Sequence, residues 1–203
     1  FDKFFGRKMF EKEQRNYLDT SELKPIDKMM DEEQFWRIVD TSLKNSNDQD
    51  SQEMEIINEL QKLPLEEIIG FRLRTDKLLY DTYTSEMWCA AYIMNGGCSD
   101  DSFEYFRCWL ISRGKQTYQK AEESPDSLIA EVSKGQDYYD FESFWYVALE
   151  AFKIKTGKDL YDFIDYDRFT SREGNYPDFE FTWEEDKPET MKAICPHLFK
   201  KFY

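Results

Sequence analysis

One seven-residue stretch, Asn95-Gly-Gly-Cys-Ser-Asp-Asp101, combines a thiol, a hydroxyl and two carboxylates with two adjacent glycines. A thiol just ahead of a helix N-terminus is a candidate nucleophile, because the helix dipole favours the thiolate. The two carboxylates that follow Cys98 oppose this effect, since nearby negative charge raises the pKa of a thiol. A base is also needed, and His197, the only histidine, lies about a hundred residues further along the chain. Nucleophilic catalysis is therefore the weaker interpretation, and no catalytic residue is predicted.

The same stretch also has a structural interpretation, as the joint between two helices. The helix that precedes it needs a left-handed residue at its end, which Gly96 or Gly97 provides without steric cost. Ser99 or Asp100 can accept the first free amides of the next helix. The negative charge of Asp100 and Asp101 complements the positive end of that helix. Each polar residue of the joint thus has a structural role.

The residues before the joint predict a helix that is buried on nearly every side. Residues 86–94 read Glu-Met-Trp-Cys-Ala-Ala-Tyr-Ile-Met and lack a polar face. Such a helix belongs in the middle of a bundle. A pocket beside it would use Arg107 as its contact for an anion. The residues predicted to bind a ligand or partner are Trp88, Tyr92, Asn95, Gly96, Gly97, Cys98, Ser99, Asp100, Asp101, Tyr105 and Arg107.

Apolar residues recur at helical spacing along most of the chain, which predicts an all-α fold of about seven to nine helices. Asp50 with Glu53 is expected to cap the second helix, and Pro64 to open the third. We expect a single helical domain at residues 29–203, behind an N-terminal extension at 1–28. Besides the buried helix, helices are predicted at residues 30–43, 50–63, 64–79, 99–114, 124–132 and 140–157, and twice within 188–203 with a break at Pro196.

Two segments depart from this helical pattern. Residues 1–10 mix phenylalanines with basic residues, as in a weak membrane-surface or partner anchor. A helix that packs its phenylalanines on the domain is the favoured alternative, because the peptide is short and contains Gly6. Residues 159–185 are acidic and aromatic, and their alternation predicts a short strand near 178–183. A lone strand is not stable, so it either pairs with another or lies extended on the helices.

Charge and composition limit the partners. The chain has 42 acidic and 27 basic side chains, a net charge of -15, which disfavours binding to nucleic acid. A basic protein would be attracted, although an acidic surface also serves solubility alone. No apolar run approaches the ~18 residues that span a bilayer, and no signal-peptide core is visible. Four cysteines without a Cys-x-x-Cys pair indicate free thiols and a cytoplasmic location. No metal site and no cofactor is predicted.

Several of these segments together resemble one known family. They include DEEQFW at residues 31–36, WCAAYIMNGGCSDDSFEYFRCWLISRG at 88–114 and FWYVALEAFKIKTG at 144–157. Over residues 30–160, and again at ICPHLFKKF, the chain is similar to a family of bacterial proteins described only as a domain of unknown function. Some relatives carry the domain beside a Trp-Gly-Arg-type module of molybdate-metabolism-regulator-like proteins. The resemblance implies a bacterial, cytoplasmic, helical domain, and it implies no catalytic residues.

Two functions remain open at this point. The favoured one is a non-catalytic interaction module whose acidic surface and 159–185 segment face a basic protein. An immunity protein or antitoxin that plugs a basic toxin is one form of it, because opposite charge speeds association. The alternative is a small-ligand-binding protein or an enzyme with a pocket near the joint at Asn95–Asp101.

Overall fold

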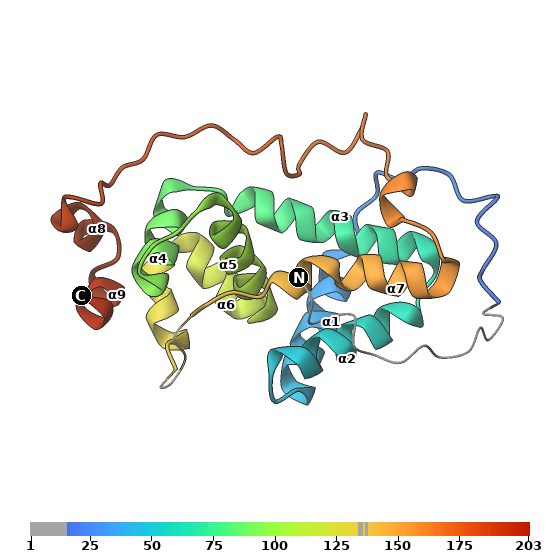
Figure 1. Ribbon diagram of the computed structural model, residues 1–203, viewed down its shortest axis with the longest axis horizontal. Coiled ribbons are helices and arrows are strands. Elements are labelled where there is room, and N and C mark those ends of the chain that lie inside the picture. The colour runs from blue at the N-terminus through green and yellow to red at the C-terminus, as the bar shows by residue number, and fades with distance from the viewer. Residues whose placement is uncertain (1–15, 134–135, 137) are drawn as a thin grey trace, which may run out of the picture.

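The architecture consists of helices. The computed structural model describes residues 16–133, 136 and 138–203. These residues form no β-strand and make only two isolated bridges, Ile26 with Ile164 and Glu184 with Lys187. The predicted all-α class is confirmed. The helices, shown in Figure 1, are α1 (Glu32–Asn45), α2 (Gln49–Gln61), α3 (Leu65–Asp81), α4 (Ser85–Asn95), α5 (Asp100–Ser112), α6 (Lys115–Glu123), α7 (Val147–Thr156), α8 (Pro188–Ile194) and α9 (Pro196–Phe202), with 3-10 turns η1 (Pro125–Glu131), η2 (Glu142–Tyr146) and η3 (Leu160–Phe163).

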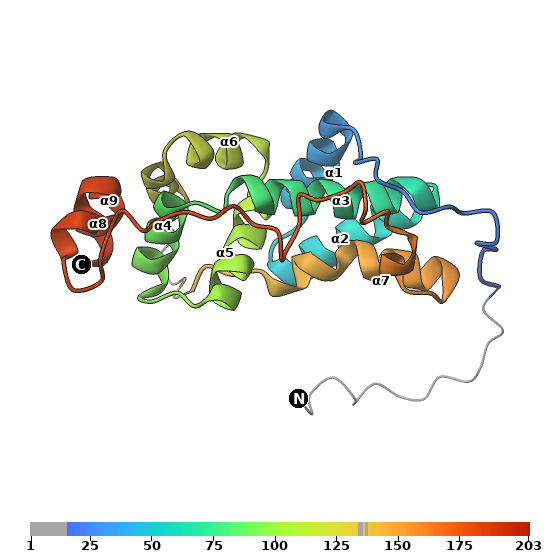
Figure 2. The same ribbon diagram turned by 90° about the horizontal axis from the view of Figure 1, so that it is seen from above.

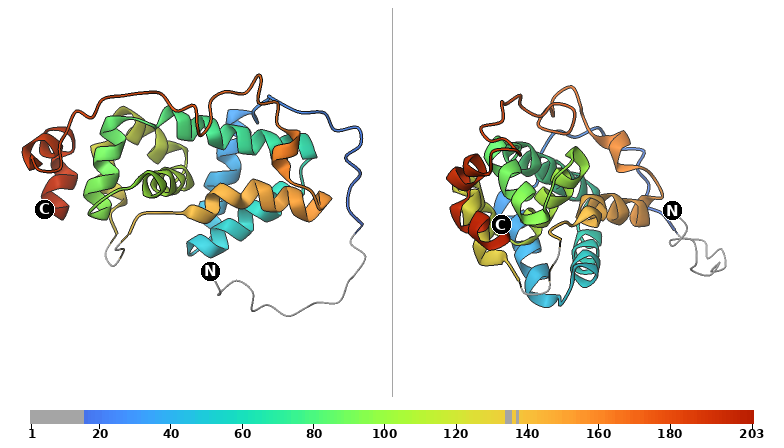
Figure 3. Two further views of the ribbon diagram at one scale, coloured as in Figure 1. Left: turned by 45° about the horizontal axis from the view of Figure 1, so that its top comes forward. Right: turned by 60° about the vertical axis from the view of Figure 1, so that its left-hand side comes forward.

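The helices are arranged along an elongated body. At one end, α1, α2 and α7 pack together with α3, and at the other end α4, α6, η1, α8 and α9 gather (Figures 1 and 3). Between them lies α5, which packs against α1, α3, α4, α6 and η2. The two ends are therefore joined through one central helix, and that helix starts at the joint.

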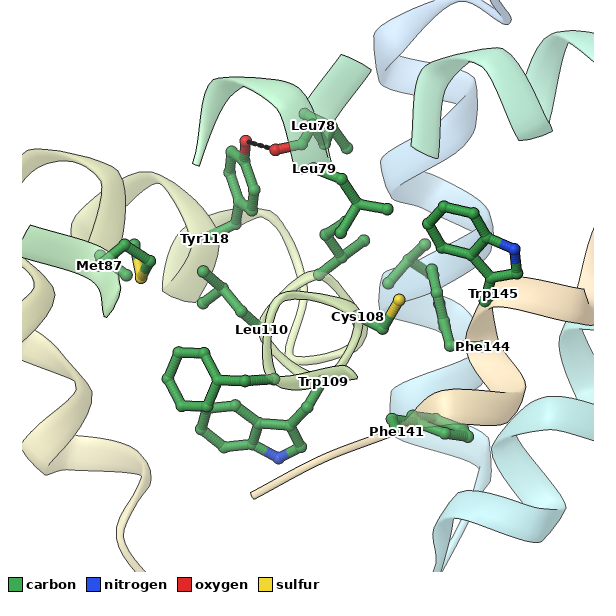
Figure 4. Close-up of a cluster of buried hydrophobic side chains, with 14 of the residues drawn as sticks. Leu78, Leu79, Met87, Cys108, Trp109, Leu110, Tyr118, Phe141, Phe144 and Trp145 are labelled. Atoms are coloured by element: carbon green, nitrogen blue, oxygen red, sulfur yellow. Dashed lines mark hydrogen bonds between the residues drawn. The ribbon is translucent and has the colours of Figure 1, made fainter. Parts of the chain in front are cut away.

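Residues Cys108–Ile111 in the second half of α5 are all apolar and buried, and this is why the helix can occupy the centre. Figure 4 shows Cys108, Trp109 and Leu110 pointing in different directions from the helix. All three are at most 1% exposed. Among the side chains around them is Tyr118 of α6, whose hydroxyl donates a hydrogen bond to the Leu78 carbonyl of α3 at 2.8 Å. A helix without a polar face is stable only inside such a core.

The buried helix predicted before the joint is α4, and its burial is confirmed. Its side chains from Met87 to Met94 are at most 8% exposed, apart from Tyr92, which is half-buried. Thr84 caps its start by accepting a hydrogen bond from the Met87 amide at 3.2 Å. Contacts with α5, α8, α9 and η1 enclose it.

Four local predictions need correction. The second helix is capped by Asp48 in a box with Ser51, and not by Asp50. Pro64 stands just before α3 as its N-cap. Residues 125–131 form 3-10 turns, and a 3-10 stretch also precedes α7. The expected strand near 178–183 does not form, because no neighbouring strand is present among the described residues, and the segment takes the extended alternative.

Residues 16–30 are held against the end of α7 and the segment that follows it. The Leu18 amide donates to the Lys155 carbonyl at 2.8 Å. Ile26 donates to the Phe163 carbonyl and accepts from the Asp165 amide, both at 2.9 Å. The predictions for residues 1–10 lie outside the described residues.

From η3 the chain continues as a long segment, residues 165–187, which we call the strap. It runs across α3 and α4 to α8 and is the orange trace along the top of Figure 1 and across the helices in Figure 2. Its end is fixed to α4, because the Trp183 indole donates to the Ser85 carbonyl at 3.0 Å. The Thr182 amide also donates to the Ser85 hydroxyl, at 2.9 Å. The strap is therefore fixed to the start of α4.

Candidate functional site

The joint between α4 and α5 has the expected geometry. Gly96 adopts the left-handed conformation, with φ 66° and ψ 28°, and its amide donates to the Tyr92 carbonyl. The Gly97 amide donates to the same carbonyl at 3.0 Å. Ser99 caps α5 by accepting a hydrogen bond from the Ser102 amide at 3.3 Å. The glycines thus satisfy the end of one helix while the serine satisfies the start of the next.

A hollow of about 400 Å³ lies beside this joint, under the strap. We call it the aromatic depression. Two of its residues, Trp88 and Asp100, were predicted as site residues. The full lining is Tyr83, Trp88, Asp100, Gly174, Tyr176, Pro177, Asp178, Phe179 and Phe181.

The rings of the depression form a continuous cluster. Tyr83 lies parallel to Tyr176, with ring centroids 4.3 Å apart and planes 9° apart. Phe179 meets the Tyr83 ring at 5.4 Å. Phe181 meets Trp88 edge-on, also at 5.4 Å, and is 53% exposed. A phenylalanine so exposed on an otherwise packed ring cluster marks this face as one that other molecules can contact.

Two carboxylates border these rings. Asp100 starts α5, and Asp178 belongs to the strap; both are exposed. Neither makes an ion pair or hydrogen bond with any residue that the structure describes. The faces of aromatic rings attract cations through their quadrupole, and a nearby carboxylate adds a direct charge interaction. This arrangement favours a positively charged group.

Arg107 lies beneath the depression and not in its lining. It is 1% exposed, and its guanidinium donates to the carbonyls of Leu79 and Phe103. It also lies 4.7 Å from the Tyr176 ring centroid and 5.0 Å from that of Tyr83. The predicted role of Arg107 as an anion contact has no support here, because its donors are covered by rings.

Glu104, next to the depression, is a carboxyl whose pKa lies near neutral pH. It lies half-buried on α5 and accepts a hydrogen bond from the Tyr176 hydroxyl at 3.4 Å. Burial, and to a smaller extent the charge of Glu173, raises the pKa of Glu104 to about 7, while Arg107 opposes the rise. Its charge therefore changes near neutral pH, directly under the strap.

Other predicted residues have structural contacts. The Asn95 side chain accepts from the Tyr139 amide at 2.8 Å and donates to the Tyr139 carbonyl at 3.2 Å. Tyr92 packs on the Trp183 ring, with centroids 5.1 Å apart. Burial, together with Glu142, raises the pKa of Tyr105 to about 12. These three side chains hold neighbouring segments in place and do not line the depression.

Cys98 lacks the character of an activated thiol. Burial raises its pKa to about 12, against the smaller opposing influence of Arg107. Its carbonyl accepts a hydrogen bond from the Trp88 indole at 3.4 Å. The lone histidine, His197, is instead bonded through Nδ1 to the Asp126 carboxylate at 2.6 Å. The thiolate needed for nucleophilic attack is thus disfavoured at neutral pH.

The described residues include no group of three His, Cys, Asp or Glu side chains that could hold a metal ion. Their helices are also all too short or too polar to span a bilayer.

Sequence reasoning missed the residues that complete the depression. Tyr83 lies in the turn before α4, and Tyr176, Phe179 and Phe181 come from the strap. The acidic and aromatic composition of residues 159–185 was a signal for a partner-facing segment. Nothing in the sequence showed that this segment lies on Trp88.

A family model described as a protein of unknown function, DUF4240, matches residues 30–154. The chain belongs to the DUF4240 family. No curated protein and no solved structure matches it. The DUF4240 region contributes Tyr83, Trp88 and Asp100 to the aromatic depression, while the strap lies beyond it. The depression is therefore a composite of the family domain and the segment that follows.

Proposed function

We propose that this DUF4240 protein is a non-catalytic interaction module that binds a basic protein partner at the aromatic depression. The observation that carries the proposal is one hollow beside the joint that combines clustered aromatic rings with two carboxylates, Asp100 and Asp178, whose side chains pair with no other described residue. A lysine or arginine side chain of a partner fits both features, since it stacks on rings and pairs with carboxylates.

The charge of the surrounding strap supports the same partner. Residues 173–186 carry six carboxylates and no lysine or arginine. The whole chain has a net charge of -15, so a basic protein is drawn to it over distances of about a Debye length, roughly 10 Å at 0.1 M salt. An immunity protein or antitoxin for a basic toxin is one biological form of such a module.

The experiment uses a dye-labelled heptapeptide of alternating arginine and threonine as the basic probe. Its binding to the full chain is followed by fluorescence anisotropy at about 25 and 300 mM salt. The variant Asp100→Asn/Asp178→Asn removes two charges from the depression. The control Glu22→Gln/Asp27→Asn removes two exposed charges from residues 16–30, and neither side chain makes a hydrogen bond or ion pair with another described residue.

We expect binding that weakens at the higher salt, and a loss of about tenfold in the depression variant but not in the control. The absence of binding at low salt, or an equal loss in both variants, would contradict the proposal.

A small cationic molecule is the second candidate, because the depression of about 400 Å³ lies within the usual size range of small-ligand sites. Thermal-shift measurements with tetramethylammonium and argininamide separate the two functions. A ligand present at 100 times its dissociation constant adds about 2.7 kcal/mol of stability. Stabilisation by these compounds without binding of the peptide favours the small-ligand function.

A further inference from the structure

The middle of the strap has a backbone with unused hydrogen-bonding groups. Residues 177–181 form neither helix nor strand; the amides of residues 178–181 and the carbonyls of residues 177–181 make no hydrogen bond to other described residues, and Pro177 has no amide. Bonded residues flank this stretch on both sides, because the Asn175 amide donates to Arg172 and the Thr182 amide donates to Ser85. Such a stretch presents the same free groups as the edge strand of a sheet.

The side chains of this stretch alternate as they do in a half-buried strand. Phe179 packs on Tyr83, and Phe181 packs on Trp88. Asp178 and Glu180 are both exposed. The backbone is therefore held straight by the two phenylalanines, while its polar groups remain accessible at the sides.

On the basis of the basic-partner function proposed above, we propose that the partner binds as an extended segment that pairs with residues 177–181 as an added β-strand. In this mode main-chain hydrogen bonds position the peptide and alternate side chains read its sequence. Lysine or arginine residues at every second position of the partner lie opposite Asp178 and Glu180, where opposite charges stabilise a strand pair.

The same charges disfavour a second copy of this chain as the occupant. Pairing of two straps would bring acidic residues next to acidic residues, and like charges in opposite positions destabilise a strand pair. Charged residues on an edge are also a common protection against self-association. The charges of the strap thus favour pairing with a basic strand and disfavour pairing with the strap of a second copy.

If the partner pairs as a strand, alternate amides of the strap become protected from hydrogen exchange, which charge attraction alone does not cause. In an extended chain, the amides of Asp178 and Glu180 point to one side, and those of Phe179 and Phe181 to the other. Only one side faces the partner. Amide hydrogen exchange, measured residue by residue by NMR on the full chain with the arginine-threonine heptapeptide, reads this difference directly. We expect one of the two pairs to be protected about tenfold and the other pair to be unchanged.

Two N-methylated forms of the probe provide the matched control. One is methylated at its threonine amides and the other at its arginine amides, so each blocks one edge while the charge stays the same. We expect one form to lose about tenfold in affinity and the other to bind like the parent peptide.

The outcomes separate the two proposals. If the parent peptide binds but no alternating protection appears, or if both methylated forms bind like the parent or lose affinity equally, strand addition is overturned and the basic-partner function stands. If the parent peptide does not bind at all, both proposals fail.

Discussion

Replacement of Glu104 by glutamine tests the electrostatics beneath the strap. The pKa of this carboxyl is raised from 4.5 to about 7 in the folded protein, mainly by burial. An acid with a raised folded pKa makes the folded state bind more protons than the unfolded state between these two values. The wild-type protein therefore loses stability as the pH rises from about 4.5 to about 7. Glutamine keeps the hydrogen-bonding shape and removes this titration.

The size of the effect follows from the shift and from the exposure of the side chain. A fully buried group with this shift would account for about 3 kcal/mol. Because Glu104 is only half-buried, solvent screening reduces the figure to about 1–2 kcal/mol. We therefore expect the Glu104→Gln variant to be more stable than the wild type by about 1–2 kcal/mol at pH 8. At pH 5 the two should agree within about 0.5 kcal/mol.

Urea unfolding of both proteins at pH 5 and pH 8 measures these free energies, and unchanged m-values show that the same structure unfolds. The variant Glu22→Gln is the control, since it also removes one negative charge from the acidic chain but lies exposed in residues 16–30. A stability gain that is equal at both pH values, or equal in the control, would refute the reasoning.

Further predictions concern the joint and the core. Gly96→Ala should destabilise the protein by about 1 kcal/mol and lower Tm by roughly 2–4 °C, because φ at this position is 66°. No steric clash adds to this cost, since no atom lies within 4 Å of the added methyl group. Calorimetry should show a smaller loss of stability for Gly96→Asn. Asp76→Ala should cost about 3–5 kcal/mol in urea unfolding, since it leaves buried Arg72 without its partner at 2.7 Å, whereas Arg72→Met/Asp76→Leu should cost less. Iodoacetamide at pH 7 should alkylate Cys98 at least about tenfold more slowly than free cysteine, because its pKa is raised to about 12.

Local patterns were sufficient for the helices and their ends. The apolar run of α4 predicted a buried helix, and the glycine and serine of the joint predicted its turn, because these features depend on neighbours within a few residues. Arg72 and Asp76 are four residues apart, the spacing at which side chains of one helix can pair. Their burial does not follow from this spacing, since spacing alone does not show which face of α3 meets the core.

The site depended on contacts that no local pattern contains. Arg107 looked like a contact for anions, but α5 turns it inward, under the rings of Tyr83 and Tyr176. The alternating residues near 178–183 looked like a strand, but the described residues include no strand to pair with them. In both cases the outcome depends on which distant segments pack against the residue, and the local sequence does not contain this information.

The sequence by itself determined that this chain is helical and acidic and that it contains a buried helix ending at paired glycines, because hydrophobic periodicity, charge and turn chemistry act over short distances along the chain. Only the tertiary structure decided that the strap lies on Trp88 and completes a depression bordered by the carboxylates of Asp100 and Asp178. That contact joins residues about ninety positions apart, and it is selected by the total burial of many side chains, which no single segment encodes.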